Sequence, residues 1–158
     1  MAGTRHWRRQ AVVSDQRPHP AATTGPTVPF WLRVAFVLSV FGTLLYFSIV
    51  PAPGTGSISQ GPFGVIPYSM WLHVVGYMGF AIVLGYASDP LEVPQSQLLF
   101  GVFVFTVGCG VAVELLQYTL PTRTFSVLDM LVNAVGAAIG VTLWYLFSRL
   151  RESGRRVQ

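Results

Sequence analysis

Four apolar segments, each about as long as a bilayer is thick, limit what this chain can fold into. They run over approximately residues 31–50, 69–87, 98–118 and 126–147. At 1.5 Å per residue, about 20 helical residues match a hydrocarbon core of roughly 30 Å. Only 10% of the 158 residues are charged, against about 25% in an ordinary soluble domain. The sequence therefore predicts an all-α bundle of four transmembrane helices.

Prolines stand at the segment boundaries, where they end helices without breaking them. These boundary residues are Pro29, Pro51, Pro67, Pro90, Pro94 and Pro121. Residues 1–29 are polar, rich in Arg, Pro and Thr, and show no periodicity, so they are expected to form a disordered basic arm. The membrane domain is expected over residues 30–148, followed by a basic tail over 149–158.

The basic residues are all arginines, and they gather at the two ends of the chain. They flank apolar segments without interleaved aromatic residues, which favours anchoring at lipid headgroups over nucleic-acid binding. Four spans place both termini on the same side of the membrane, and the positive-inside rule predicts that this side is the cytoplasm of the cell. The loop at 51–68 carries no charge, whereas the loop at 88–97 carries only Asp89 and Glu92. Acidic residues count little in this rule, so the predicted orientation stands.

With that orientation, three spans present polar side chains at similar depth near the outer face. Residues four apart lie on one helix face, which groups the polar residues of the second span and those of the fourth. The predicted polar cluster consists of His73, Tyr77, Glu114, Gln117, Arg123, Asp129 and Asn133. We expect this cluster to hold whatever binding or catalytic role the protein has.

The same residues carry a family resemblance. Glu114-x-x-Gln117-x-x-x-Pro121-x-Arg123 and Asp129-x-x-x-Asn133-x-x-Gly136-x-x-x-Gly140 resemble motifs of the VanZ-like family of small membrane proteins, and His73-x-x-x-Tyr77 is similar to its upstream motif. The family often has an Asp-Lys pair just before the histidine, where this chain has Ser69-Met70. The family is named for a protein linked to glycopeptide resistance, and the resemblance implies an envelope membrane protein but no reaction.

Each charged member of the cluster has a structural and a functional interpretation. Glu114 and Arg123 either form an ion pair that fixes the outer loop, or Arg123 binds a headgroup or carboxylate that Glu114 orients. Ser126-x-x-Asp129 has capping-box spacing, and an acid in the first turn complements the helix dipole. Asn133, one turn deeper, is expected to make an interhelical hydrogen bond.

His73 is compatible with three roles. It could be a hydrogen-bonded packing residue, a general acid or base, or a metal ligand beside Glu114 and Asp129. No spacing such as H-E-x-x-H is present, so neither a metal nor another cofactor is expected. Cys109 lies among apolar residues and is expected to be structural. Gly136 and Gly140 are spaced for close helix packing within the bundle.

Three hypotheses remain open, and the sequence favours the first. The protein is a non-enzymatic envelope protein whose outward polar pocket engages a lipid headgroup or an envelope precursor. Alternatively, it is a membrane-embedded enzyme that acts on a lipid-linked substrate with His73 as acid or base. Thirdly, it is a structural accessory subunit of a membrane-protein partner, and its polar cluster only locks the bundle.

Overall fold

The computed structural model of this chain describes residues 28–50, 60–64, 66–121 and 125–155, and these ranges contain helices and no strand. The helices are α1 (Phe30–Ile49), η1, a single 3₁₀ turn (Pro62–Gly64), α2 (Tyr68–Ser88), α3 (Gln95–Tyr118) and α4 (Val127–Arg155). The four α-helices are each long and apolar enough to cross a membrane, which confirms the predicted all-α architecture. Apart from Val28 and Pro29, the predicted arm lies outside the described residues.

The first three α-helices begin in the same way, directly after a proline. The carbonyl oxygens of Pro29, Pro67 and Pro94 accept hydrogen bonds from the N–H groups four residues later, at 3.3, 3.2 and 3.1 Å. Proline has no N–H of its own, so a helix start is the place where it removes no helical hydrogen bond. These prolines therefore set where each helix enters the membrane.

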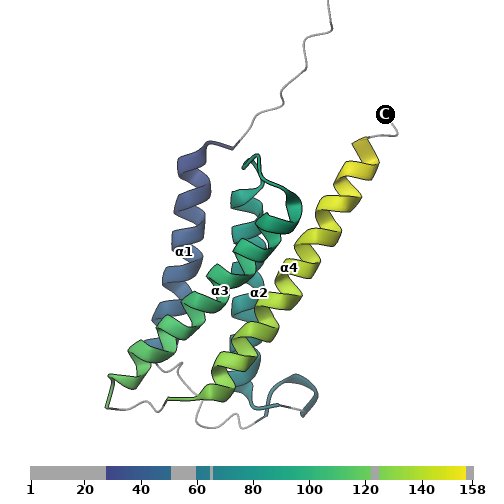
Figure 1. Cartoon of the computed structure of the whole chain (residues 1–158). Coiled ribbons are helices and arrows are strands. Elements are labelled where there is room, and N and C mark those ends of the chain that lie inside the picture. Colours follow the sequence, from purple (N-terminus) through teal and green to yellow (C-terminus); the bar gives the residue numbers. More distant parts are fainter. Residues whose placement is uncertain (1–27, 51–59, 65, 122–124, 156–158) are drawn as a thin grey trace, which may run out of the picture.

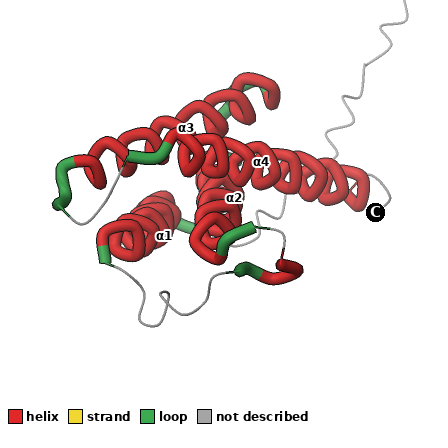
Figure 2. Tube along the Cα trace, turned by 90° about the horizontal axis from the view of Figure 1, so that it is seen from below, coloured by secondary structure: helices red, strands yellow, loops and turns green. Residues whose placement is uncertain are grey.

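α2 is the central helix of the bundle. It contacts the other three, and its contact with α4 is the most extensive. Figure 2, a view along α1 and α2, shows α2 beside α1 and against α4. α1 lies at the periphery and has no buried residue. In Figure 1, α3 and α4 are inclined to α1, and α3 crosses the bundle obliquely. We call the end where α3 leads into α4 the Ser126 end, and the opposite end, where α2 leads into α3, the Asp89 end.

Two glycines of α4 bring its backbone close to that of α2. A Cβ added at Gly136 would lie 2.5 Å from the carbonyl oxygen of Val74. One added at Gly140 would collide with the carbonyl oxygen of Met78 and lie 2.8 Å from Cβ of Ala81. Without a hydrophobic driving force between helices in lipid, such close contact is the main source of association. The α2–α4 pair is therefore the packed centre of the fold.

α4 extends beyond its predicted apolar segment and continues to Arg155. Its 29 residues give a length of about 43 Å, more than the roughly 30 Å of the hydrocarbon core. Contacts at the Asp89 end hold this extension. Arg151 forms an ion pair with Asp89 at 2.5 Å, and the side-chain amide of Gln95 donates to the hydroxyl of Ser148 at 3.1 Å.

We predict that Gly136→Ala and Gly140→Ala each destabilise the protein by about 1–3 kcal/mol, because the added methyl group forces α2 and α4 apart. Gly108→Ala in α3 is the matched control, since an added Cβ there has no neighbour within 4 Å. The control is expected to be neutral or stabilising by up to about 1 kcal/mol, from helix propensity alone. Unfolding in detergent measures all three, and equal effects at the three positions would contradict the packing argument.

Candidate functional site

Apart from Arg123, which lies outside the described residues, the polar side chains predicted to cluster lie on α2, α3 and α4 near the Ser126 end. Four of them are almost fully buried: Tyr77 is 1% exposed, Glu114 1%, Asn133 2% and Gln117 4%. Burial of polar groups in an apolar bundle is unfavourable unless they are hydrogen-bonded. Their partners therefore decide what this cluster can do.

Glu114 caps the helix that follows its own. Its Oε1 accepts a hydrogen bond from the backbone N–H of Ser126, just before α4, at 2.5 Å. The Ser126 hydroxyl in turn accepts from the backbone N–H of Asp129 at 3.1 Å. In a capping box the acid at Asp129's position reaches back to the Ser126 N–H. Here a carboxylate from α3 takes that place, and its negative charge lies against the positive end of the α4 dipole.

His73 and Asn133 join α2 to α4. Nδ1 of His73 lies 2.9 Å from Oδ1 of Asn133. Because a carbonyl oxygen only accepts, Nδ1 is the donor in this arrangement. The ring of His73 stacks on that of Tyr77 with centroids 6.4 Å apart. An added Cβ at Gly110 would meet both Asn133 and Tyr77 at 3.1–3.2 Å, so the absence of a side chain on α3 leaves room for this group.

Gln117 ties the peripheral α1 to α3. Its side-chain amide nitrogen donates to the backbone carbonyl of Ser48 at 2.7 Å. Ser48 lies in the last turn of α1, where carbonyl groups have no partner within the helix. An unsatisfied carbonyl is unfavourable in lipid, and this bond therefore fixes the end of α1 to the cluster.

Asp129 differs from the buried members of the cluster. It lies in the first turn of α4 and is partly exposed. Among residues 28–50, 60–64, 66–121 and 125–155, nothing pairs with its carboxylate. Arg123, the other charged residue predicted at this end, lies outside the described residues, so its predicted pairing with Glu114 stays a prediction.

The arrangement limits the chemistry that these groups can perform. His73 makes no hydrogen bond or ion pair with Glu114 or Asp129 within the described part of the chain, where its polar partner is Asn133. In that same part, no three His, Cys, Asp or Glu side chains converge as metal ligands. Cys109 is a half-buried free thiol of α3. The buried cluster is thus mainly a hydrogen-bonded connection between helices.

Three contributors to the cluster were not singled out from the sequence. Ser126 was considered only as a partner of Asp129, Ser48 contributes through its backbone carbonyl, and Gly110 contributes only space. A backbone acceptor has no sequence signature. Gly110 could have been recognised from the sequence, because it stands four residues before Glu114 and the two residues therefore share one face of α3.

We predict that Glu114→Ala lowers stability by about 1–3 kcal/mol, because the Ser126 N–H loses its acceptor in a buried site. Glu114→Gln keeps an oxygen at that position and is expected to lose less. Glu92→Ala, which removes an exposed acid of the α2–α3 loop, serves as the control and should leave the midpoint of thermal unfolding in detergent unchanged. A Glu114→Ala protein that unfolds at the wild-type temperature would refute the capping role.

A double-mutant cycle tests the contact between α2 and α4. We expect His73→Ala and Asn133→Ala to show a coupling of about 0.6 kcal/mol, the mean for interhelical hydrogen bonds in membranes. His73→Ala combined with Ser148→Ala, at the far end of α4, should be additive. The free energies come from unfolding in mixed micelles, and additivity in the first cycle would mean that the two side chains do not interact.

Comparison with known proteins assigns the chain to a family. No curated protein and no solved structure matches the chain. The model of the VanZ/LLP1 family matches residues 27–148, which include all four helices up to Ser148 and every residue of the cluster. The chain, a multi-pass membrane protein of four apolar helices, therefore belongs to the VanZ/LLP1 family.

Proposed function

We propose that this protein is a non-enzymatic membrane protein of the cell envelope that binds a phosphate-bearing lipid headgroup, or the headgroup of a lipid-linked envelope precursor, at its Ser126 end. In this proposal, the positive-inside rule places the Ser126 end at the outer face of the cell membrane and both termini in the cytoplasm. Arg123 in the α3–α4 loop binds the phosphate, and Asp129 accepts hydrogen bonds from donors of the headgroup.

The observation that carries the proposal is the release of Asp129 from the helix cap. Glu114 already accepts the hydrogen bond from Ser126, so the acid at the capping-box position is not needed there. Its carboxylate remains partly exposed in the first turn of α4. A carboxylate kept at the end of an apolar helix without a capping task is a candidate for ligand contact.

The buried residues support this site without contacting the ligand. Glu114 fixes the start of α4, and the His73–Asn133 bond fixes the next turn against α2. Asp129 is thereby held between two anchored residues, Ser126 and Asn133. A binding site needs such a rigid support, because misplaced groups lose affinity.

The test is stabilisation by lipid in mixed micelles of phosphatidylcholine and detergent. Phosphatidylglycerol added in increasing amounts should raise the thermal midpoint of the wild type. In Arg123→Ala, half-maximal stabilisation should require about fivefold more of this lipid, the effect of one arginine at an anionic surface. Asp129→Asn should weaken the same response.

Arg149→Gln is the matched control, because it removes an exposed arginine at the Asp89 end. Its response to phosphatidylglycerol should equal that of the wild type. A response that Arg123→Ala and Asp129→Asn leave intact would sink the proposal. A loss of equal size in the control would show attraction to basic residues in general and would sink it as well.

The internal pairing of the cluster favours a second candidate, a structural accessory subunit. Four of the predicted cluster residues are almost fully buried, and three of them make hydrogen bonds to other helices or to the start of α4. A subunit of this kind should purify with a membrane-protein partner after gentle detergent extraction. A monodisperse monomer that responds to phosphatidylglycerol would favour the headgroup site.

A further inference from the structure

An apolar groove opens on the bundle at the Asp89 end, far from the polar cluster. It consists of two adjoining hollows of about 460 and 210 Å³ that share Leu84, Ser88 and Leu91. The larger lies between α2, the α2–α3 loop and α3, and the smaller lies between α1 and α2. Their combined size falls within the range of small-molecule sites, about 300–1,000 Å³.

The groove exists because α1 and α3 are joined at one end and separate at the other. At the Ser126 end the Gln117–Ser48 bond connects them. Towards the Asp89 end, α3 moves away from α1 along its oblique path (Figure 1). α2 is left as the floor between them, which is why Leu84 and Ser88 line both hollows.

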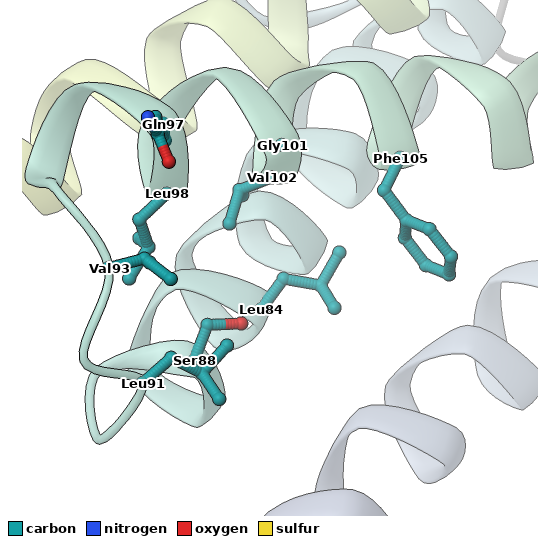
Figure 3. Close-up of a pocket in the computed structure, with 9 residues that line it drawn as sticks. All are labelled: Leu84, Ser88, Leu91, Val93, Gln97, Leu98, Gly101, Val102 and Phe105. Carbon is teal, nitrogen blue, oxygen red and sulfur yellow. The ribbon is translucent and has the colours of Figure 1, made fainter.

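The walls of the larger hollow are mostly apolar, and Ser88 and Gln97 are the polar residues among those that line it. Figure 3 shows Leu84 and Ser88 of α2 facing Val102 of α3, with Leu91 closing one side and Phe105 extending beyond them. Gly101 also lines the hollow, and an added Cβ there would meet nothing within 4 Å. A mostly apolar surface of this kind within the hydrocarbon layer accommodates a chain of methylene groups.

Arg33 borders the smaller hollow and is held in place by α2. Its Nη1 donates to the carbonyl oxygen of Tyr86 at 3.2 Å, its Nε donates to that of Val28 at 3.1 Å, and its guanidinium lies 5.0 Å from the centre of the Tyr86 ring. A guanidinium has five N–H donors, so Nη2 and one proton of Nη1 stay available.

The charge of Arg33 has no acidic partner in the part of the chain that the structure describes. Asp89, at the same end of the bundle, pairs with Arg151. Within the described residues, two backbone carbonyls, those of Tyr86 at the end of α2 and of Val28, and the Tyr86 ring offset the charge of the arginine. An apolar groove that ends at a fixed guanidinium matches an amphiphile with an apolar chain and an anionic head.

We infer that this groove binds one anionic phospholipid, with an acyl chain between α1, α2 and α3 and its phosphate on Arg33. Guanidinium binds phosphate through two parallel hydrogen bonds, and both Nη atoms have donors free for this contact. The site is separate from the headgroup site proposed at the Ser126 end, and it uses none of the same residues.

The test is photo-crosslinking with phosphatidylglycerol that carries a diazirine in its acyl chain. The protein is reconstituted in phosphatidylcholine vesicles that contain a small fraction of this probe, and the labelled peptides are mapped by mass spectrometry. We expect labels in residues 84–91 and 98–105. In wild-type protein, unlabelled phosphatidylglycerol should compete about fivefold better than phosphatidylcholine.

Two variants distinguish binding of the lipid's acyl chain from binding of its phosphate. Gly101→Leu fills the hollow and should reduce labelling of both segments to background, whereas Gly108→Leu, on an exposed part of the same helix with equal free space, should not. Arg33→Gln should abolish the preference for phosphatidylglycerol. Arg149→Gln is its control, because Arg149 also stacks on a tyrosine, at 5.8 Å from the ring centre of Tyr145, and does not line the groove.

Several outcomes would overturn the inference. Labels absent from both segments of the wild type would mean that the groove holds something else, such as another part of the chain or a second copy. Labelling that survives Gly101→Leu, or a preference that survives Arg33→Gln, would also refute it. None of these three results bears on the Ser126 end, because Arg123→Ala and Asp129→Asn test that site separately.

Discussion

The need to pair the backbone N–H groups at the start of α4 governs how α3 and α4 are joined. Backbone groups at a helix start have no partner within the helix, and in lipid they must find one inside the protein. The Ser126 hydroxyl meets this need for Asp129, and Glu114 meets it for Ser126 itself. Because the carboxylate comes from α3, the same bond that begins α4 also fixes the two helices against each other. The position of Asn133 and of the glycines that follow it depends on this start.

Close packing then extends the order set at the Ser126 end along α4. Gly136 and Gly140 lie against backbone carbonyls of α2, and one turn farther the ring of Trp144 packs on Gly85. Here the two helices exchange roles, because α2 supplies the small residue, Gly85, and α4 supplies the large one, Trp144. Small residues allow contact between backbones at Gly136 and Gly140, whereas at Gly85 the ring of Trp144 lies directly against the backbone of α2. Two inclined helices are thus held together along their length.

The sequence was sufficient to predict the helices but not the contacts between them. Segment length, apolar composition and boundary prolines predicted four spans, and α1, α2 and α3 do begin after Pro29, Pro67 and Pro94. These are local properties of a chain in lipid. The partner of Glu114 depends on how far α3 and α4 are rotated about their axes, and one residue of helix changes that by about 100°. The acceptor of Gln117 is a backbone carbonyl, which any residue supplies. The extension of α4 to Arg155 depends in part on Asp89, which is distant in sequence.

The two ends of the bundle differ in how they meet the membrane. At the Ser126 end, hydrogen bonds from Glu114, Gln117 and His73 join all four helices. At the Asp89 end, polar contacts join α4 to the loop and to α3, and Arg33 joins α1 to α2, but no comparable bond links α1 to α3 within the described ranges. A bundle fixed at one end and splayed at the other must expose a groove to lipid at the splayed end. The same polar bonds that join the helices at the Ser126 end therefore leave the apolar groove at the opposite end.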